Sequence, residues 1–115
     1  MTERTQAEVL NRIDLFCIAL QAFCNSRGKE LPYSYVITSE VGKKNVRIVR
    51  RELWPNSEEP QHGSVHCFID LATGNILKAD GWKRPAPQVR GSIFKEDFDI
   101  GPGKAVGEFG AAYLR

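Results

Sequence analysis

The pattern of apolar and polar residues changes its period after residue 27. Over Thr5–Arg27, apolar residues recur every three or four positions, which is the spacing of a helix with one buried face. Thr5 and Glu8 have the spacing of a capping box, and Gly28 stands where a glycine often ends a helix. This pattern predicts an amphipathic helix that packs on a sheet. Its wide apolar stripe consists of Val9, Leu10, Ile13, Phe16, Cys17, Leu20, Phe23 and Cys24.

After the helix, apolar and polar residues alternate, as in strands with one buried face. Turn residues divide this region into two hairpins, the first around Gly42 and the second over Asp70–Asn75. We expect Gly74 in the left-handed region, where it would form a bulge and set the register of the second hairpin. The four predicted strands are Tyr33–Glu40, Val46–Leu53, Ser64–Leu71 and Ile76–Trp82, with a loop over Trp54–Gly63.

The last part of the chain is rich in proline, glycine and charge. Pro85 and Pro87 cannot donate to a sheet ladder, so we predict an extended arm after the fourth strand. Lys104–Arg115 predicts a short helix, which Gly107 and Gly110 weaken by up to ~1 kcal/mol each. The predicted fold class is α+β, a single domain over residues 1–115. An N-terminal amphipathic helix packs on an antiparallel sheet of about four strands, followed by the proline-rich arm and a short C-terminal helix.

Composition limits the class of protein. The 115 residues suit one domain, and a net charge of +2 does not by itself require a polyanionic partner. The sequence has neither an apolar run of ~18 residues nor the apolar core of a signal peptide, so we expect no membrane span and a cytoplasmic protein. Cys17 and Cys24 would lie ~10 Å apart on one helix, too far for a disulfide, so we expect free thiols.

Candidate catalytic and metal-binding groups do not combine into a site. His66 and Cys67 are adjacent, but strand alternation sends them to opposite faces, and no second cluster completes a metal site. Gly101–Lys104 lacks the eight-residue pattern of a phosphate-binding P-loop. We therefore predict no enzyme, no cofactor and no metal.

Cations and an aromatic residue gather around the fourth strand and the arm. Arginine forks suit phosphate oxygens, and a tryptophan ring suits a nucleobase. The alternative interpretation is a set of solvated faces, with Trp82 filling the core. The candidate binding residues are Lys78, Trp82, Lys83, Arg84, Arg90, Gly91 and Ser92, joined by Arg47, Arg50 and Arg51 of a second basic cluster that also contains Lys43 and Lys44.

The stretch from Phe68 to Phe94 resembles small bacteriophage and prophage proteins. In these proteins a strand ends in an Asp-x-x-Thr-Gly turn, and a lysine-bearing strand, a Trp-Lys-x-Pro-Ala arm and an Arg-Gly-x-x-Phe segment follow. The resemblance implies a phage setting, with roles such as nucleic-acid handling or interference with host defence. The matching residues are Asp70, Thr73, Gly74, Lys78, Trp82, Lys83, Pro85, Ala86, Arg90, Gly91 and Phe94.

These observations lead to one main hypothesis and two alternatives. The main hypothesis is a non-enzymatic phage-type binding protein for a phosphate-bearing ligand, either single-stranded nucleic acid or a nucleotide. The first alternative is a phage anti-defence protein that inhibits a host protein by direct docking through the proline-rich arm. The second is a virion or assembly component. We also expect a homo-oligomer, and the host cell cytoplasm as the location if a phage encodes the chain.

Overall fold

The computed structural model describes residues 5–82, 84–101, 106–107 and 110–111. Helix α1 spans Gln6–Arg27, and its capping box is present as predicted. The backbone N–H of Glu8 donates to the Thr5 hydroxyl at 3.2 Å, and the backbone N–H of Thr5 donates to the Glu8 carboxylate at 3.2 Å. Gly28 ends the helix with a φ of −103°, outside the left-handed region. A Cβ at Gly28 would lie 2.8 Å from a terminal methyl of Leu31 and 3.2 Å from the Tyr35 ring, so both side chains would have to shift.

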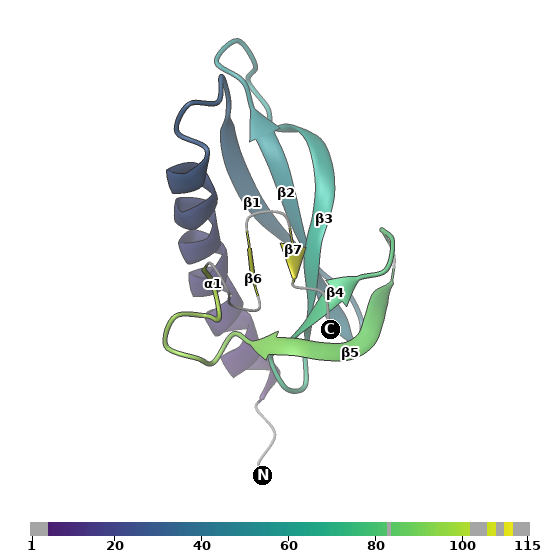
Figure 1. Ribbon diagram of the computed structural model, residues 1–115. Helices are drawn as coiled ribbons and strands as arrows, with labels where there is room; N and C mark the ends of the chain where they lie inside the picture. Colours follow the sequence, from purple (N-terminus) through teal and green to yellow (C-terminus); the bar gives the residue numbers. More distant parts are fainter. Residues whose placement is uncertain (1–4, 83, 102–105, 108–109, 112–115) are drawn as a thin grey trace.

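Five antiparallel strands form one sheet in the order β1-β2-β3-β4-β5 (Figure 1). The helix on an antiparallel sheet and the two predicted hairpins are therefore confirmed, but the expected number of about four strands is one too few. The third strand also starts earlier than predicted, inside the stretch assigned to a loop. The strands are β1 (Ser34–Val41), β2 (Asn45–Leu53), β3 (Gln61–Asp70), β4 (Asn75–Ala79) and β5 (Pro85–Ser92).

The fifth strand is the segment that we predicted to be a proline-rich arm. Pro85 lies opposite Ala79 at one end of the β4–β5 ladder, and Pro87 falls within an irregularity of that ladder. Both prolines thus lie on an edge strand, where a missing N–H is tolerated. Figure 1 shows β4 and β5 crossing the lower end of the sheet at a steep angle to β1–β3.

Side-chain hydrogen bonds and a glycine define the conformation of the turn between β3 and β4. The Asp70 carboxylate accepts the backbone N–H groups of Ala72 at 2.7 Å and Thr73 at 3.2 Å, an Asx-type turn. Gly74 has a φ of +76°, as predicted, and a side chain there would overlap the ring of Phe94. The glycine therefore serves both the backbone conformation and the packing.

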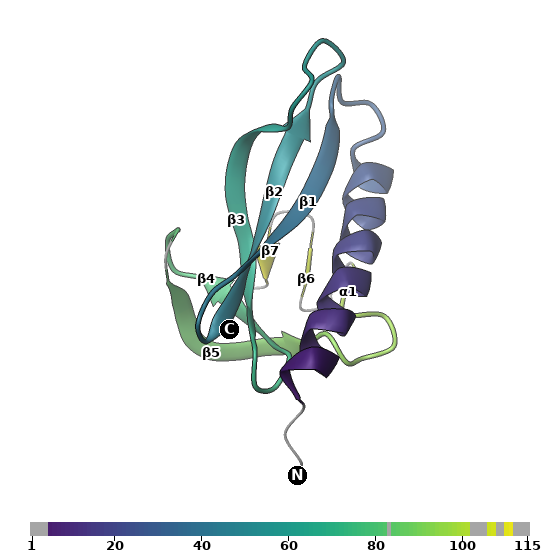
Figure 2. The same cartoon turned by 180° about the vertical axis from the view of Figure 1, so that it is seen from behind.

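One apolar core lies between α1 and the sheet. The buried residues of α1 are those predicted from the stripe, except that Leu10, Cys17 and Phe23 lie at its margin. Figures 1 and 2 both show the short C-terminal strands between α1 and β3. The strand residues of the core are Tyr35, Ile37, Val46, Ile48, Cys67, Ile69, Ile76 and Val106, and Leu71 joins them from the turn after β3.

The predicted C-terminal helix is wrong where the structure describes it. Val106–Gly107 (β6) and Gly110–Ala111 (β7) pair as a short antiparallel hairpin, and Val106 is fully buried. The two glycines weaken a helix, whereas in the hairpin the carbonyl of Gly107 accepts a hydrogen bond from the buried His66 at 2.6 Å. Packing against the sheet thus decides the conformation. The rest of the predicted helix lies outside the described residues.

Arg12 attaches the segment after β5 to the helix. Its guanidinium donates to the carbonyls of Ile93 at 2.7 Å and Lys95 at 2.8 Å. Its Cζ also lies 4.0 Å from the ring centroid of Phe98, a cation–π contact. The helical pattern assigns Arg12 only to the polar side, and these long-range contacts are not visible in the sequence.

Side chains of α1 cover part of the outer edge of β1. The Asn25 side chain accepts the Tyr35 N–H at 2.7 Å and donates to the Tyr35 carbonyl at 3.2 Å. Gln21 accepts the Ile37 N–H at 3.0 Å. These bonds occupy backbone groups that an added strand would otherwise use. Among the described residues, no helix is long and apolar enough to span a membrane.

Candidate nucleic-acid interface

The side of the sheet away from α1 carries polar and apolar side chains in similar numbers, and we call it the open face. Strand alternation and register place its residues: in β1 and β2, Glu40 lies opposite Arg47 and Val36 opposite Arg51, and Arg47 in turn lies opposite Phe68 of β3. Val49 and Phe68 are buried within this face. The open face consists of Val36, Thr38, Glu40, Arg47, Val49, Arg51, Val65, Phe68 and Leu77.

Trp82 and Arg47 meet at this face. Trp82 belongs to the tight turn between β4 and β5, which a hydrogen bond from the Asp80 N–H to the Arg84 carbonyl closes at 2.8 Å. The Arg47 Cζ lies 5.1 Å from the Trp82 ring centroid, within the range of a cation–π contact. Trp82 remains 42% exposed, so it does not fill the core. The structure thus joins the two predicted basic clusters through one aromatic contact.

Glu40 connects two arginines of the open face. One carboxylate oxygen lies 2.8 Å from Arg47 Nη1, and the other lies 3.9 Å from Arg51 Nη2. The Arg51 guanidinium lies against Gly63 of β3, where a side chain would displace it. Both guanidiniums are therefore held across the strands rather than extended into solvent.

A hollow of about 420 Å³ opens beside this group, at the β1–β2 hairpin. Its charged residues are Glu40, Lys43, Lys44 and Arg47, three cations and one carboxylate. Phe68 supplies an apolar floor. A concave cationic surface next to a partly exposed tryptophan is suited to a phosphate with an attached aromatic base.

Comparison with known proteins gives a family. The family model described as "Family of unknown function (DUF7717)" matches residues 1–99. The chain belongs to the DUF7717 family. No curated protein and no solved structure matches it. The matched range contains α1 and strands β1–β5, and hence all of the open face of this DUF7717 protein.

Several predicted site residues of the DUF7717 chain lie away from the Trp82–Arg47 contact. Arg50 lies on the α1 side of the sheet, opposite Ile37, with its Cζ 4.9 Å from the Tyr35 ring centroid. Strand alternation puts Lys78 on the side of its neighbour Ile76, which is buried in the core. Alternation along each strand therefore places basic residues that are close in sequence on opposite faces of the sheet.

The predicted residues of β5 are separated along the strand. Arg84 directly precedes β5 and is exposed near Trp82, whereas Gly91 and Ser92 are ~20 Å further along, at ~3.3 Å per residue. Gly91 pairs with Ile76, and the Ser92 hydroxyl accepts the Phe94 N–H at 3.1 Å, so both serve the fold. Lys83 lies outside the described residues.

Arg90 has a different environment from the exposed cations. It is half-buried, and its Nε and Nη1 have no hydrogen-bond partner among the described residues. The ladder irregularity between its neighbours Val89 and Gly91 turns this side chain out of the regular alternation. The structure does not bring Arg90 into contact with Trp82.

Burial shifts the pKa values of three titratable groups near the core. Burial lowers the pKa of His66 to about 4; its bond to the Gly107 carbonyl opposes this shift and the nearby charge of Arg50 adds to it. Burial and the nearby Asp14 raise the pKa of the Cys17 thiol to about 11, and burial raises the pKa of Cys67 still further. Such thiols are poor nucleophiles. Within the described part of the chain, no group of three or more metal-ligating side chains is present.

Glu40 and the hollow at the β1–β2 hairpin are not among the features predicted from the sequence. The predicted loop over residues 41–45 implies that Glu40 faces Val46, whereas the structure centres the hairpin between Lys43 and Lys44 and pairs Glu40 with Arg47. Lys43 and Lys44 were noted as cations of the second cluster, but not as the wall of a concave surface.

Proposed function

We propose that this DUF7717 protein is a non-enzymatic binding protein that holds single-stranded nucleic acid, or a nucleotide, on its open face. The observation that carries the proposal is the Arg47 guanidinium over the partly exposed Trp82, next to a cationic hollow. Base–aromatic stacking contributes ~1–3 kcal/mol per base and tolerates any sequence. Arginines and lysines at the same place supply the attraction to phosphate.

In the proposed complex, a base stacks on the exposed surface of Trp82, while a phosphate lies toward Arg47 and the hollow. Lys43 and Lys44 line the far side of the hollow and extend the positive field along a bound strand. Arg84, exposed beside the Trp82 turn, adds a further cation.

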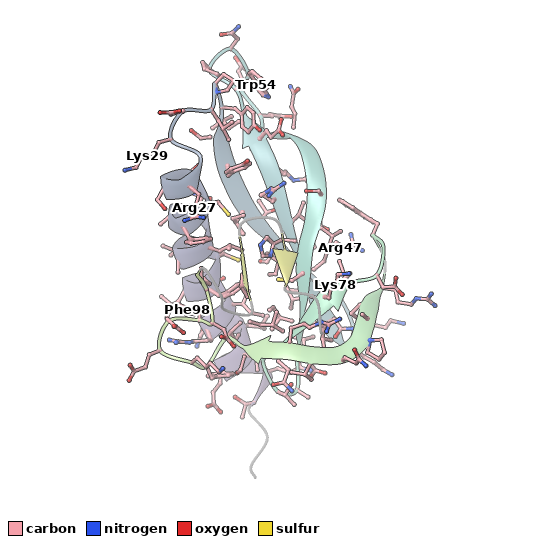
Figure 3. All side chains as sticks on the ribbon, viewed as in Figure 1. Arg27, Lys29, Arg47, Trp54, Lys78 and Phe98 are labelled. Carbon is pink, nitrogen blue, oxygen red and sulfur yellow. The ribbon has the colours of Figure 1, made fainter. Side chains whose placement is uncertain are left out.

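The test is fluorescence anisotropy with a fluorescein-labelled oligothymidylate. Trp82→Ala and Arg47→Gln should each weaken binding about tenfold or more, from the loss of the stacking platform and of one phosphate contact. Lys29→Ala removes a cation from the other side of the molecule, and Figure 3 shows Lys29 near the end of α1, far from Arg47. This control should bind as the wild type does.

Salt dependence supplies the second readout. Each phosphate neutralised on a single strand contributes a slope of ~0.7 log units of affinity per log unit of salt. The salt slope of the Arg47→Gln variant should therefore be shallower by ~0.7 than that of the wild type. A wild-type protein without measurable affinity at low salt, or variants no weaker than Lys29→Ala, would remove the proposal.

Docking on a host defence protein is the second candidate, and the structure changes its basis. The arm was expected to be available for docking, but Pro85–Ser92 pairs with β4 as strand β5. Side chains of α1 also occupy groups of the β1 edge. These two features favour the open face over strand addition as the binding surface.

The phage setting, the virion role and the homo-oligomer remain predictions. The outer side of α1 exposes Leu15 at 51% and Ile18 at 68%, which is the apolar surface that a symmetric contact through the helix would use. Size-exclusion chromatography with light scattering tests this, because Ile18→Lys would dissociate such a dimer and leave a monomer unchanged.

A further inference from the structure

Glu40 is placed as a bound anion would be placed. Its two carboxylate oxygens face different arginines, Arg47 at 2.8 Å and Arg51 at 3.9 Å. Glu40 also lines the cationic hollow. The carboxylate therefore occupies the point between two guanidiniums and beside two lysines.

The chemistry of this point suits one particular anion. A phosphodiester carries a single negative charge shared by two non-bridging oxygens, as a carboxylate does, and planar guanidiniums bind both groups in a similar geometry. The present ion pairs are weak competitors, because Glu40 is 44% exposed and exposed pairs contribute ~0–1 kcal/mol. A nucleic-acid phosphate can thus replace the carboxylate at small cost.

We infer that Glu40 holds the position of one backbone phosphodiester and limits the affinity of the open face for nucleic acid. The inference rests on the proposed function and adds a specific subsite to it. A strand whose base stacks on Trp82 places its phosphate between Arg47 and Arg51, after the Glu40 side chain turns aside. The next phosphate lies toward Lys43 and Lys44 in the hollow. Glu40 therefore acts as a built-in competitor.

The experiment compares two variants that add the same charge at different places. Glu40→Gln removes the competitor from the subsite, whereas Glu30→Gln neutralises an exposed carboxylate in the connector between α1 and β1. With labelled oligothymidylate, Glu40→Gln should bind about fivefold more tightly and show a salt slope steeper by ~0.7. Glu30→Gln should match the wild type.

Two further measurements separate competition from a general charge effect. Arg51→Gln in the Glu40→Gln background should abolish most of the gain, because the freed guanidinium is lost. An oligothymidylate with an uncharged methylphosphonate backbone should gain nothing from Glu40→Gln. Circular dichroism of each variant verifies the fold, and the exposed Glu40 leaves little stability to lose.

The outcomes distinguish the inference from the proposed function. Binding by the wild type with no gain in Glu40→Gln, an equal gain in Glu30→Gln, or a gain that persists on the uncharged backbone overturns the phosphodiester subsite alone. Absence of binding by both the wild type and Glu40→Gln overturns the proposed function together with it.

Discussion

Replacing Asn25 by alanine tests how the sheet edge is closed. The Asn25 amide makes two hydrogen bonds to one residue of β1, accepting the Tyr35 N–H at 2.7 Å and donating to the Tyr35 carbonyl at 3.2 Å. Tyr35 itself is buried, so its backbone groups are poorly placed to take water instead. Asn25→Ala therefore removes the side chain that bonds both the donor and the acceptor of Tyr35 at this edge.

The expected loss follows from these two bonds. A net ~0.5–1.5 kcal/mol per hydrogen bond, with an added penalty for partly buried groups, gives a destabilisation of about 2 kcal/mol. At ~2.1 cal/mol/K of unfolding entropy per residue, a chain of 115 residues converts this loss into a decrease in Tm of about 8 °C. The opened edge should also promote pairing between molecules.

Urea denaturation followed by circular dichroism measures the change in unfolding free energy, and light scattering measures association. Asn11→Ala is the matched control, because it makes the same substitution at an exposed position of the same helix. Asn25→Asp keeps the acceptor for the Tyr35 N–H and should lose less than Asn25→Ala. An Asn25→Ala protein as stable and monomeric as the control would refute the edge-closing role.

Three more predictions concern the core and the turns. Gly74→Ala should lower the free energy of unfolding by about 1–3 kcal/mol because of the positive φ, and further because of the clash with Phe94. Gly81 has a φ of +99° and open space around it, so Gly81→Ala should lose only the contribution of the backbone conformation. Thermal melts of both variants measure the difference. Burial lowers the pKa of His66 from 6.5 to about 4, so the native state favours the neutral imidazole. The free energy of unfolding should therefore be highest above pH 6.5 and decrease by about 3 kcal/mol as the pH falls to 4. Urea titrations at several pH values measure this dependence, and His66→Gln should flatten it. The raised pKa of Cys17 predicts that the native protein reacts with a thiol reagent at pH 7 far more slowly than the protein in urea, and equal rates would contradict its burial.

The local elements of the fold could be predicted from the sequence, because they depend on contacts between near neighbours. The capping box at Thr5, the apolar stripe of α1 and the turn with Gly74 in the left-handed region all follow from short spacings. The fifth strand could not be predicted, since its prolines argue against a strand unless the segment is known to lie at an edge. Likewise, the glycines around Val106 only weaken the predicted C-terminal helix, and nothing in their spacing shows that this segment pairs as a hairpin instead.

The candidate site was predicted in part. Arg47, Arg50 and Arg51 were predicted as one basic cluster, but the register of β2 puts Arg50 opposite Ile37, on the α1 side of the sheet. The contact between Arg47 and Trp82 joins residues from β2 and from the β4–β5 turn, so it depends on the curvature of the sheet. Sequence spacing grouped Arg90 with Trp82, although Arg90 lies near the far end of β5, beyond the ladder irregularity around Pro87.

The most direct test of the proposed interface is the fluorescence of Trp82 during titration with oligothymidylate. Trp54→Phe leaves Trp82 as the sole tryptophan, because the chain contains only two. We predict that bound oligothymidylate strongly quenches the Trp82 fluorescence and that high salt reverses the quenching. Quenching and the anisotropy of the labelled strand should reach saturation at the same oligonucleotide concentration. Anisotropy that reports binding while the Trp82 emission stays constant would place the ligand elsewhere and contradict the account.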